Sequence, residues 1–139
     1  MRTPVSSPVQ SELLVETSAL AAILFEEPEW EEFTERIVHA KCWTTSINIF
    51  ETVLALTELV ATPPTDAHAR VLRLIERLKI AIVPFTPEML PHAVAARERY
   101  GRGRKGLNMG DCLSYAAAKQ LGLTLLYKGD DFARTDVNG

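Results

Sequence analysis

The chain has 139 residues, enough for one domain with its own core and too few for a second domain of ordinary size. Its 15 basic and 18 acidic residues give a formal net charge of −3, which excludes a general positive field for nucleic acid, so any such contact needs a local patch. Cys42 and Cys112 have no metal-type spacing, and they indicate a reducing, cytoplasmic compartment.

The start of the chain is rich in Pro and Ser, and residues 1–10 are expected to form a disordered tail. The most apolar window runs from Leu13 to Phe25 and is interrupted by Glu16. It is shorter than the ~20 apolar residues that a membrane-spanning helix needs. We therefore expect no membrane-spanning segment.

Strand-like and helix-like patterns alternate from residue 13 onward. Thr17 or Ser18 is the expected N-cap of the first helix, and Pro63 and Pro64 are expected to end the third. The predicted order is strand 13–16, helix 17–25, helix 28–40, strand 42–45, helix 48–61, helix 66–79, a buried strand 80–85, helix 86–99, helix 111–121 and strand 123–127. This alternation predicts an α/β domain with a mostly parallel sheet.

Carboxylates occur where apolar stretches give way to turns or helix starts. Glu16 ends the first strand, Glu51 is placed in the first turn of the helix after the second strand, and Asp111 opens a helix. Asp130 and Asp131 follow the last strand. Ligands of open α/β sheets bind outside the carboxyl ends of the strands, so these acids are expected to meet at one edge.

Each acid also has a purely structural explanation. Asn48 and Glu51 have the spacing of a capping box, and Asp111 would complement a helix dipole. The acids of the GDD sequence suit an ordinary turn. Thr17 and Ser18 either orient a metal-bound water or cap a helix.

Taken together, the acids would place several negative charges at one edge, and a cation would relieve their repulsion. Carboxylates without His or Cys suit a hard ion, Mg²⁺ or Mn²⁺. Hydrolysis of phosphodiesters is the chemistry that such sites commonly serve.

Four segments carry a family resemblance: VETSALAAIL, SINIFE, GLNMGDCLSYAAAKQLG and LLYKGDDFARTDV. They resemble the PIN-domain ribonucleases, specifically the VapC-type toxins. The resemblance implies a single PIN domain over residues 11–139, with a three-layer α/β/α sandwich. It also implies an endoribonuclease that depends on Mg²⁺ or Mn²⁺, cleaves tRNA or rRNA, forms a homodimer and is neutralised by a VapB-type antitoxin.

By position, the resemblance assigns a set of acids and supporting side chains. Asp131 matches the fourth family acid better than Asp130, but both residues are candidates for that position. The assigned residues are Glu16, Glu51, Asp111, Asp131 and Asp130 as catalytic, with Glu16, Asp111 and Asp131 as metal ligands and Thr17, Ser18 and Asn48 in support.

The chain departs from the family at Glu16, where the family normally has Asp. The extra methylene moves the carboxylate by about 1.5 Å, and Mg²⁺ is strict about its octahedral geometry. A catalytically weak or silent PIN-fold module is therefore an alternative to an active nuclease. A phosphatase-like domain is a third alternative, but it would need a second Asp close to Glu16, where the chain has Thr17 and Ser18.

A basic segment, RERYGRGRKG, lies just before Asp111 and is expected to contact RNA phosphates, with a solvated helix end as the alternative. A groove near Trp30, Phe33 and the stretch 54–59 is the expected seat of an antitoxin helix. The predicted RNA-binding residues are Arg99, Arg102, Arg104, Lys105 and Lys128.

Overall fold

A computed structural model describes residues 10–103 and 106–137, so most of the expected tail at 1–10 lies outside the described residues, as do Arg104 and Lys105. The strands are β1 (Ser11–Val15), β2 (Ala40–Thr45), β3 (Ala81–Val83) and β4 (Thr124–Leu126). The helices are α1 (Thr17–Leu24), α2 (Trp30–Val38), α3 (Ser46–Val60), α4 (Pro64–Arg77), α5 (Leu90–Tyr100) and α6 (Met109–Leu121), and a short 3-10 helix, η1 (Pro87–Met89), precedes α5.

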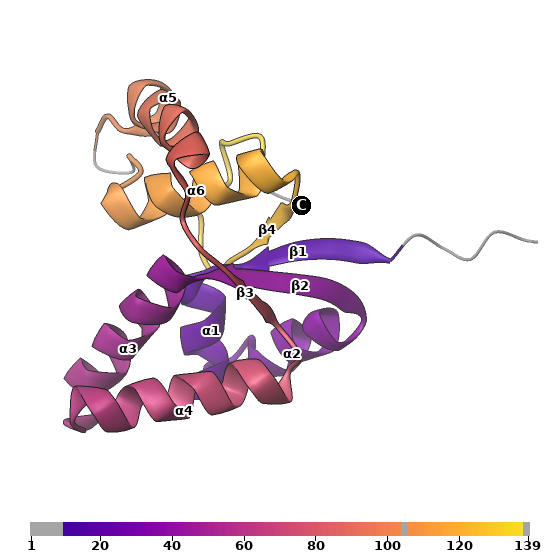
Figure 1. Ribbon diagram of the computed structural model, residues 1–139, viewed down its shortest axis with the longest axis vertical. Coiled ribbons are helices and arrows are strands. Elements are labelled where there is room, and N and C mark those ends of the chain that lie inside the picture. Colours follow the sequence, from indigo (N-terminus) through magenta and orange to yellow (C-terminus); the bar gives the residue numbers. More distant parts are fainter. Residues whose placement is uncertain (1–9, 104–105, 138–139) are drawn as a thin grey trace, which may run out of the picture.

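The strands form one parallel sheet in the order β3-β2-β1-β4. Helices α1 to α4 lie on one side of it, and α5 and α6 lie on the other (Figure 1). This arrangement confirms the predicted three-layer α/β/α sandwich with a mostly parallel sheet. Within the described ranges, no helix combines the length and apolar content needed to cross a membrane.

The protein has one hydrophobic core on each face of the sheet, and alternating side chains of β1 contribute to both. Leu13 and Val15 of β1 pack with α1 to α4, whereas Leu14 packs with α5 and α6. On β4, Leu126 faces the first core and Leu125 the second. Neighbouring side chains of a strand point to opposite faces, which explains why the buried residues 13–15 of β1 are all apolar.

The predicted buried strand at 80–85 is wrong in extent and in burial. β3 has three residues, Ala81 is exposed, and Ile82 has 49% of its surface exposed. Ile80, just before β3, is the residue that enters the core. The strand lies at the edge of the sheet and pairs only with β2 among the described strands, so its β-branched residues are not enclosed.

Pro63 and Pro64 follow α3, and Pro64 also begins the next helix, α4. α3 ends at Ala61 in the left-handed conformation, and Pro64 is the first residue of α4, two residues earlier than predicted. Proline suits this position because the first helical residue needs no N–H partner.

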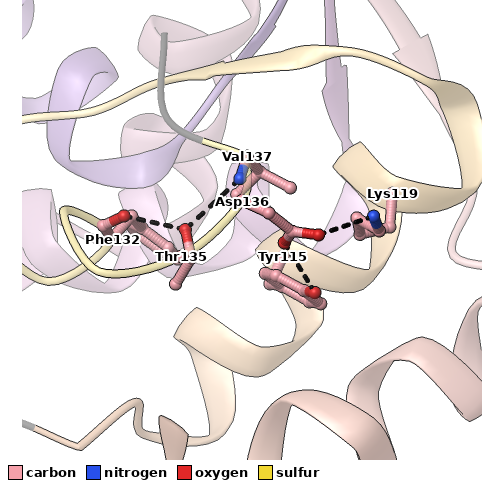
Figure 2. Close-up of polar contacts among 6 residues, drawn as sticks. All are labelled: Tyr115, Lys119, Phe132, Thr135, Asp136 and Val137. Atoms are coloured by element: carbon pink, nitrogen blue, oxygen red, sulfur yellow. Dashed lines mark hydrogen bonds and ion pairs between the residues drawn. The ribbon is translucent and has the colours of Figure 1, made fainter. Parts of the chain in front are cut away.

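The segment after β4 folds back onto α6. The Leu125 N–H donates to the carbonyl of Val137 at 2.9 Å. Asp136 accepts hydrogen bonds from the Tyr115 hydroxyl and the Lys119 ammonium, both at 2.8 Å (Figure 2). These hydrogen bonds attach the end of the 127–137 segment, which includes the predicted acidic turn, to β4 and α6.

Candidate functional site

The sheet order creates a reversal point between β1 and β4. The chain proceeds from β1 to β2 and β3 on one side, and β4 then returns to the other side of β1. Ligands of open α/β sheets bind at such a switch point, outside the carboxyl ends of the strands. Glu16 directly follows β1, and its N–H donates to the Leu126 carbonyl of β4 at 3.0 Å. The end of β1 and the turn after β4 therefore lie side by side.

Glu16 is buried, with 6% of its surface exposed, and its own side chain caps α1. The carboxylate accepts a hydrogen bond from the Ser18 N–H at 2.8 Å and another from the Ser18 hydroxyl. The prediction that Thr17 or Ser18 is the N-cap was wrong, because the Glu16 side chain is long enough to fold back to the helix start. Burial raises the pKa of Glu16 to about 7. The hydrogen bonds from Ser18 lower this pKa, and the negative charges of Asp111 and Glu51 raise it further.

Glu51 lies in the second turn of α3, not the first. The N-cap is Thr45, whose hydroxyl oxygen accepts from the Asn48 N–H at 3.1 Å, so the capping-box explanation of Asn48 and Glu51 is excluded. The Glu51 carboxylate accepts from the Thr17 hydroxyl of α1 at 3.1 Å. Burial raises the pKa of Glu51; the Thr17 bond opposes this shift and the charge of Asp111 adds to it.

Asp111 lies in the first turn of α6, as predicted, and it forms a capping box with Asn108. The Asp111 N–H donates to the Asn108 side chain at 2.8 Å, and the Asn108 N–H donates to the Asp111 carboxylate at 3.1 Å. Burial raises the pKa of Asp111, the bond from Asn108 opposes the shift, and the charge of Asp131 adds to it.

The two acids of the turn after β4 differ in their neighbours. Both are exposed. The charge of Asp131 acts on Asp111. The pKa of Tyr127 is raised by burial first and then by the charge of Asp130. Asp131 is therefore the member of the pair that lies toward the other acids.

Gly110, which precedes Asp111 on α6, was not among the predicted site residues. A Cβ atom at this position would lie 2.9 Å from the carboxyl carbon of Glu51, so the missing side chain leaves space for that carboxylate. Glycine has a low helix propensity, so a glycine within the first turn of a helix indicates a packing or functional role. That was the signal in the sequence that could have identified Gly110.

Among the predicted basic residues, Lys128 is held by acids of the segment before α2. The Lys128 ammonium contacts Glu27 at 3.0 Å and Glu29 at 3.4 Å. The backbone N–H of Lys128 donates to the Ser18 hydroxyl at 2.8 Å. Arg99 and Arg102 are exposed, at the end of α5 and in the loop that follows. Helix α5 lies on the same side of the sheet as α6 (Figure 1).

The donor set fits a hard divalent cation in its chemistry. All ligand candidates are carboxylate oxygens, and Glu16, Glu51 and Asp111 have pKa values raised partly by the charges of neighbouring acids, which a cation would relieve. Across the described parts of the chain, no three His, Cys, Asp or Glu side chains converge closely enough to hold an ion. Each of the three acids instead accepts a hydrogen bond from a neighbouring residue.

The fold is a parallel α/β/α sandwich with acids near the carboxyl edge of its sheet, and comparison with known proteins gives the family. Residues 13–138 match the family model of the PIN domain. A VapC ribonuclease of Rhizobium meliloti (strain 1021) is 38% identical, with 88% of this chain and 97% of the relative covered. Ribonuclease VapC of Mycolicibacterium smegmatis is 37% identical, with 90% and 97% covered. The chain therefore belongs to the PIN-domain family, in its VapC group.

Solved structures share the fold. Mycobacterium tuberculosis VapC20, a sarcin-ricin loop cleaving toxin, superposes with a TM-score of 0.70 at 14% identity, covering 90% of this chain and 95% of that chain. DNA-bound VapBC from Salmonella typhimurium gives a TM-score of 0.68 at 17% identity, covering 93% and 96%. At such low identities the likeness concerns the fold alone.

Proposed function

We propose that this protein is a Mg²⁺- or Mn²⁺-dependent endoribonuclease, the toxin of a type II toxin-antitoxin system, acting in the cytoplasm on RNA of the tRNA or rRNA class. One observation carries the proposal: acids from separate elements, Glu16, Glu51 and Asp111, lie near one another at the carboxyl edge of the sheet. Thr17, next to Glu16, donates to the Glu51 carboxylate at 3.1 Å, and Gly110, next to Asp111, leaves space for the same carboxylate. The curated relatives are named as VapC ribonucleases, which supports the same reaction.

In this proposal Glu16, Asp111 and Asp131 hold the cation, and Glu51 completes the acid cluster beside them. A bound cation polarises the phosphate and lowers the pKa of an attacking water. Thr17 and Ser18 orient the carboxylates of Glu51 and Glu16 through the hydrogen bonds already described. Arg99, Arg102, Arg104, Lys105 and Lys128 are the proposed RNA-binding residues. Lys128 would have to exchange its contacts with Glu27 and Glu29 for a phosphate.

The proposed assembly is a homodimer of single PIN domains, residues 11–139, neutralised by a VapB-type antitoxin. The family match over residues 13–138 supports one domain, and VapBC complexes among the solved structures of this fold support the partner. Phe33 is buried and cannot line a docking groove, whereas Leu54 and Leu59 have 44% and 71% of their surfaces exposed on α3. We place the antitoxin helix against α3, at its exposed leucines. A pull-down with the protein encoded next door would refute the partner if no complex formed.

The direct test is cleavage of total RNA by the purified protein. We expect cleavage with Mg²⁺ or Mn²⁺, none with EDTA, and loss in the Asp111→Asn variant, since that change removes a charged ligand but keeps the size of the side chain. A contaminating nuclease would be indifferent to Asp111→Asn. Equal cleavage by the variant, or cleavage in EDTA, would refute the proposed reaction.

The second candidate is a catalytically weak or silent module, and the position of Glu16 favours it. Its carboxylate is turned back to cap α1 through Ser18, so a cation must compete with that cap. Under this candidate, Glu16→Asp raises the cleavage rate, because the shorter side chain restores the family geometry. An Asp variant no faster than the wild type would eliminate the idea that Glu16 limits catalysis.

A further inference from the structure

Asn48 is a polar side chain that is completely buried among the acid-bearing elements. Its side-chain oxygen accepts a hydrogen bond from the Thr45 hydroxyl at 2.7 Å. Its side-chain nitrogen donates one hydrogen bond to the Thr17 hydroxyl oxygen at 3.0 Å and one to the Ser114 hydroxyl oxygen at 2.9 Å. Both amide protons therefore have acceptors, as a buried amide requires.

The three partners of Asn48 come from three other elements. Thr45 ends β2, Thr17 begins α1 directly after Glu16, and Ser114 lies on α6 one turn after Asp111. Asn48 itself lies one turn before Glu51 on α3. One side chain thus joins the start of α1, next to Glu16, to the helices that carry Glu51 and Asp111.

The hydrogen bonds run in one direction toward a carboxylate. The Thr17 oxygen accepts from Asn48, so its single proton is left to be donated, and the Glu51 carboxylate lies 3.1 Å away. The alternative acceptor for the Thr17 hydroxyl, the backbone carbonyl of Asn48, is farther away, at 3.5 Å. A chain of this kind fixes the orientation of its last member, because each hydroxyl can donate only once.

We propose that Asn48, anchored by Ser114 and linked through Thr17, is a positioning unit that sets the spacing of Glu16, just before α1, Glu51 on α3 and Asp111 on α6. The inference rests on the proposed function, and it assigns Ser114 a role although its hydroxyl bonds to Asn48 and not to the acids. Apolar side chains could fill the same space, but they would not fix one arrangement of three helices as directional bonds do. Groups that orient metal ligands typically cost about 10- to 100-fold in metal affinity or activity when removed.

The test compares variants that remove or keep a single hydroxyl. Thr17→Val and Ser114→Ala break the unit, whereas Thr17→Ser keeps the hydroxyl and serves as the conservative rescue. Thr44→Val is the matched control: Thr44 is equally buried, on β2, and its hydroxyl donates to the Val15 carbonyl at 2.8 Å, outside the unit. The measurements are kcat and KM on an RNA substrate, the Mn²⁺ dissociation constant by calorimetry, and the thermal unfolding midpoint.

We expect Thr17→Val and Ser114→Ala to lower kcat and to weaken Mn²⁺ binding by about 10-fold or more, with KM little changed. Thr17→Ser and Thr44→Val should stay close to the wild type. Wild-type kcat and Mn²⁺ affinity in both Thr17→Val and Ser114→Ala would overturn the positioning unit alone, as would an equal loss in Thr44→Val. A wild-type protein that neither binds Mn²⁺ nor cleaves RNA would instead refute the proposed function, and the positioning unit with it.

Discussion

Gly110 of α6 faces the carboxylate of Glu51 of α3, and the absence of a side chain at position 110 is what lets the two helices bring Glu51 next to Asp111. A Cβ atom there would displace the Glu51 carboxylate, which lies at the end of a flexible side chain and can move without unfolding the protein. We therefore expect Gly110→Ala to lower kcat by roughly 10- to 100-fold. The free energy of unfolding should be unchanged or rise by up to about 1 kcal/mol, since Ala is the better helix former.

RNA cleavage kinetics and urea unfolding of the Gly110→Ala variant measure the two quantities separately. The variant Glu51→Gln provides the reference for loss of the carboxylate itself. Adding Gly110→Ala to Glu51→Gln should cost much less than in the wild type, because the two changes act on one group. A Gly110→Ala enzyme with the wild-type rate would show that the position of Glu51 does not matter.

Glu16 should make the stability of the metal-free protein depend on pH. Its pKa is raised from 4.5 to about 7 in the folded state, chiefly by burial, so folding favours the protonated carboxyl. Its contribution to stability is fully present below pH 4.5 and is lost as the pH rises to about 7. Relative to Glu16→Gln, the wild type should lose up to about 3 kcal/mol over this range.

Unfolding by urea at a series of pH values, with and without Mn²⁺, measures this effect. Saturating Mn²⁺ should reduce the loss, because the cation stabilises the ionised carboxylate. Parallel pH profiles for the wild type and Glu16→Gln would contradict the raised pKa of this buried acid.

The hydrogen bonds of Asp136 should stabilise the segment that carries Asp131. The pKa of Asp136 is lowered by hydrogen bonds from Lys119 and then Tyr115, so the contribution of these bonds is present near neutral pH and is lost as the pH falls through the lowered pKa. Tyr115→Phe should cost about 1 kcal/mol of stability. Lys119→Met, which removes an exposed ion pair, should cost less, about 0 to 1 kcal/mol.

Thermal unfolding near neutral pH ranks the two variants. A greater loss for Lys119→Met than for Tyr115→Phe would show that the exposed ion pair, and not the tyrosine hydroxyl, holds this segment (Figure 2).

Arg99 and Arg102 should contribute to RNA affinity through phosphates. In the inactive Asp111→Asn background, each change to Ala should weaken RNA binding regardless of sequence. It should also make the slope of log affinity against log salt shallower by about 0.7 for each phosphate that the arginine would otherwise neutralise.

Filter binding at several salt concentrations checks this expectation. Arg73→Ala is the control, because Arg73 is an exposed residue of α4. Helix α4 lies on the side of the sheet opposite α5 and α6 (Figure 1). The proposal that these arginines bind phosphates fails if Arg73→Ala changes the slope as much as the other two variants do.

The alternation of strands and helices was predictable because it depends on local patterns. The apolar runs of β1 and β4 and the acid in the first turn of α6 are all signals within a few residues. The exposure of β3 was not predictable in this way. Its sequence resembles a buried strand, and only the order of the sheet, a property of the whole chain, leaves it at an edge.

The acids of the site were predictable in kind but not in their hydrogen-bond partners. Glu16 caps its own helix, and Thr45 displaces Asn48 as the cap of α3, because several side chains near a helix start compete for the same N–H groups. The bond between Asn48 and Ser114 spans 66 residues, so no local pattern could indicate it. The same holds for Gly110, whose role depends on a side chain of another helix.

The central claim is that the scattered acids form one cation site, and a calorimetric titration with Mn²⁺ tests it most directly. We predict saturable binding to the wild type that is lost, or weakened by about 10-fold or more, in Asp111→Asn. It should be unchanged in Asp66→Asn, which alters an exposed acid in the first turn of α4. Undetectable binding to the wild type, or equal binding by the wild type and Asp111→Asn, would contradict the account.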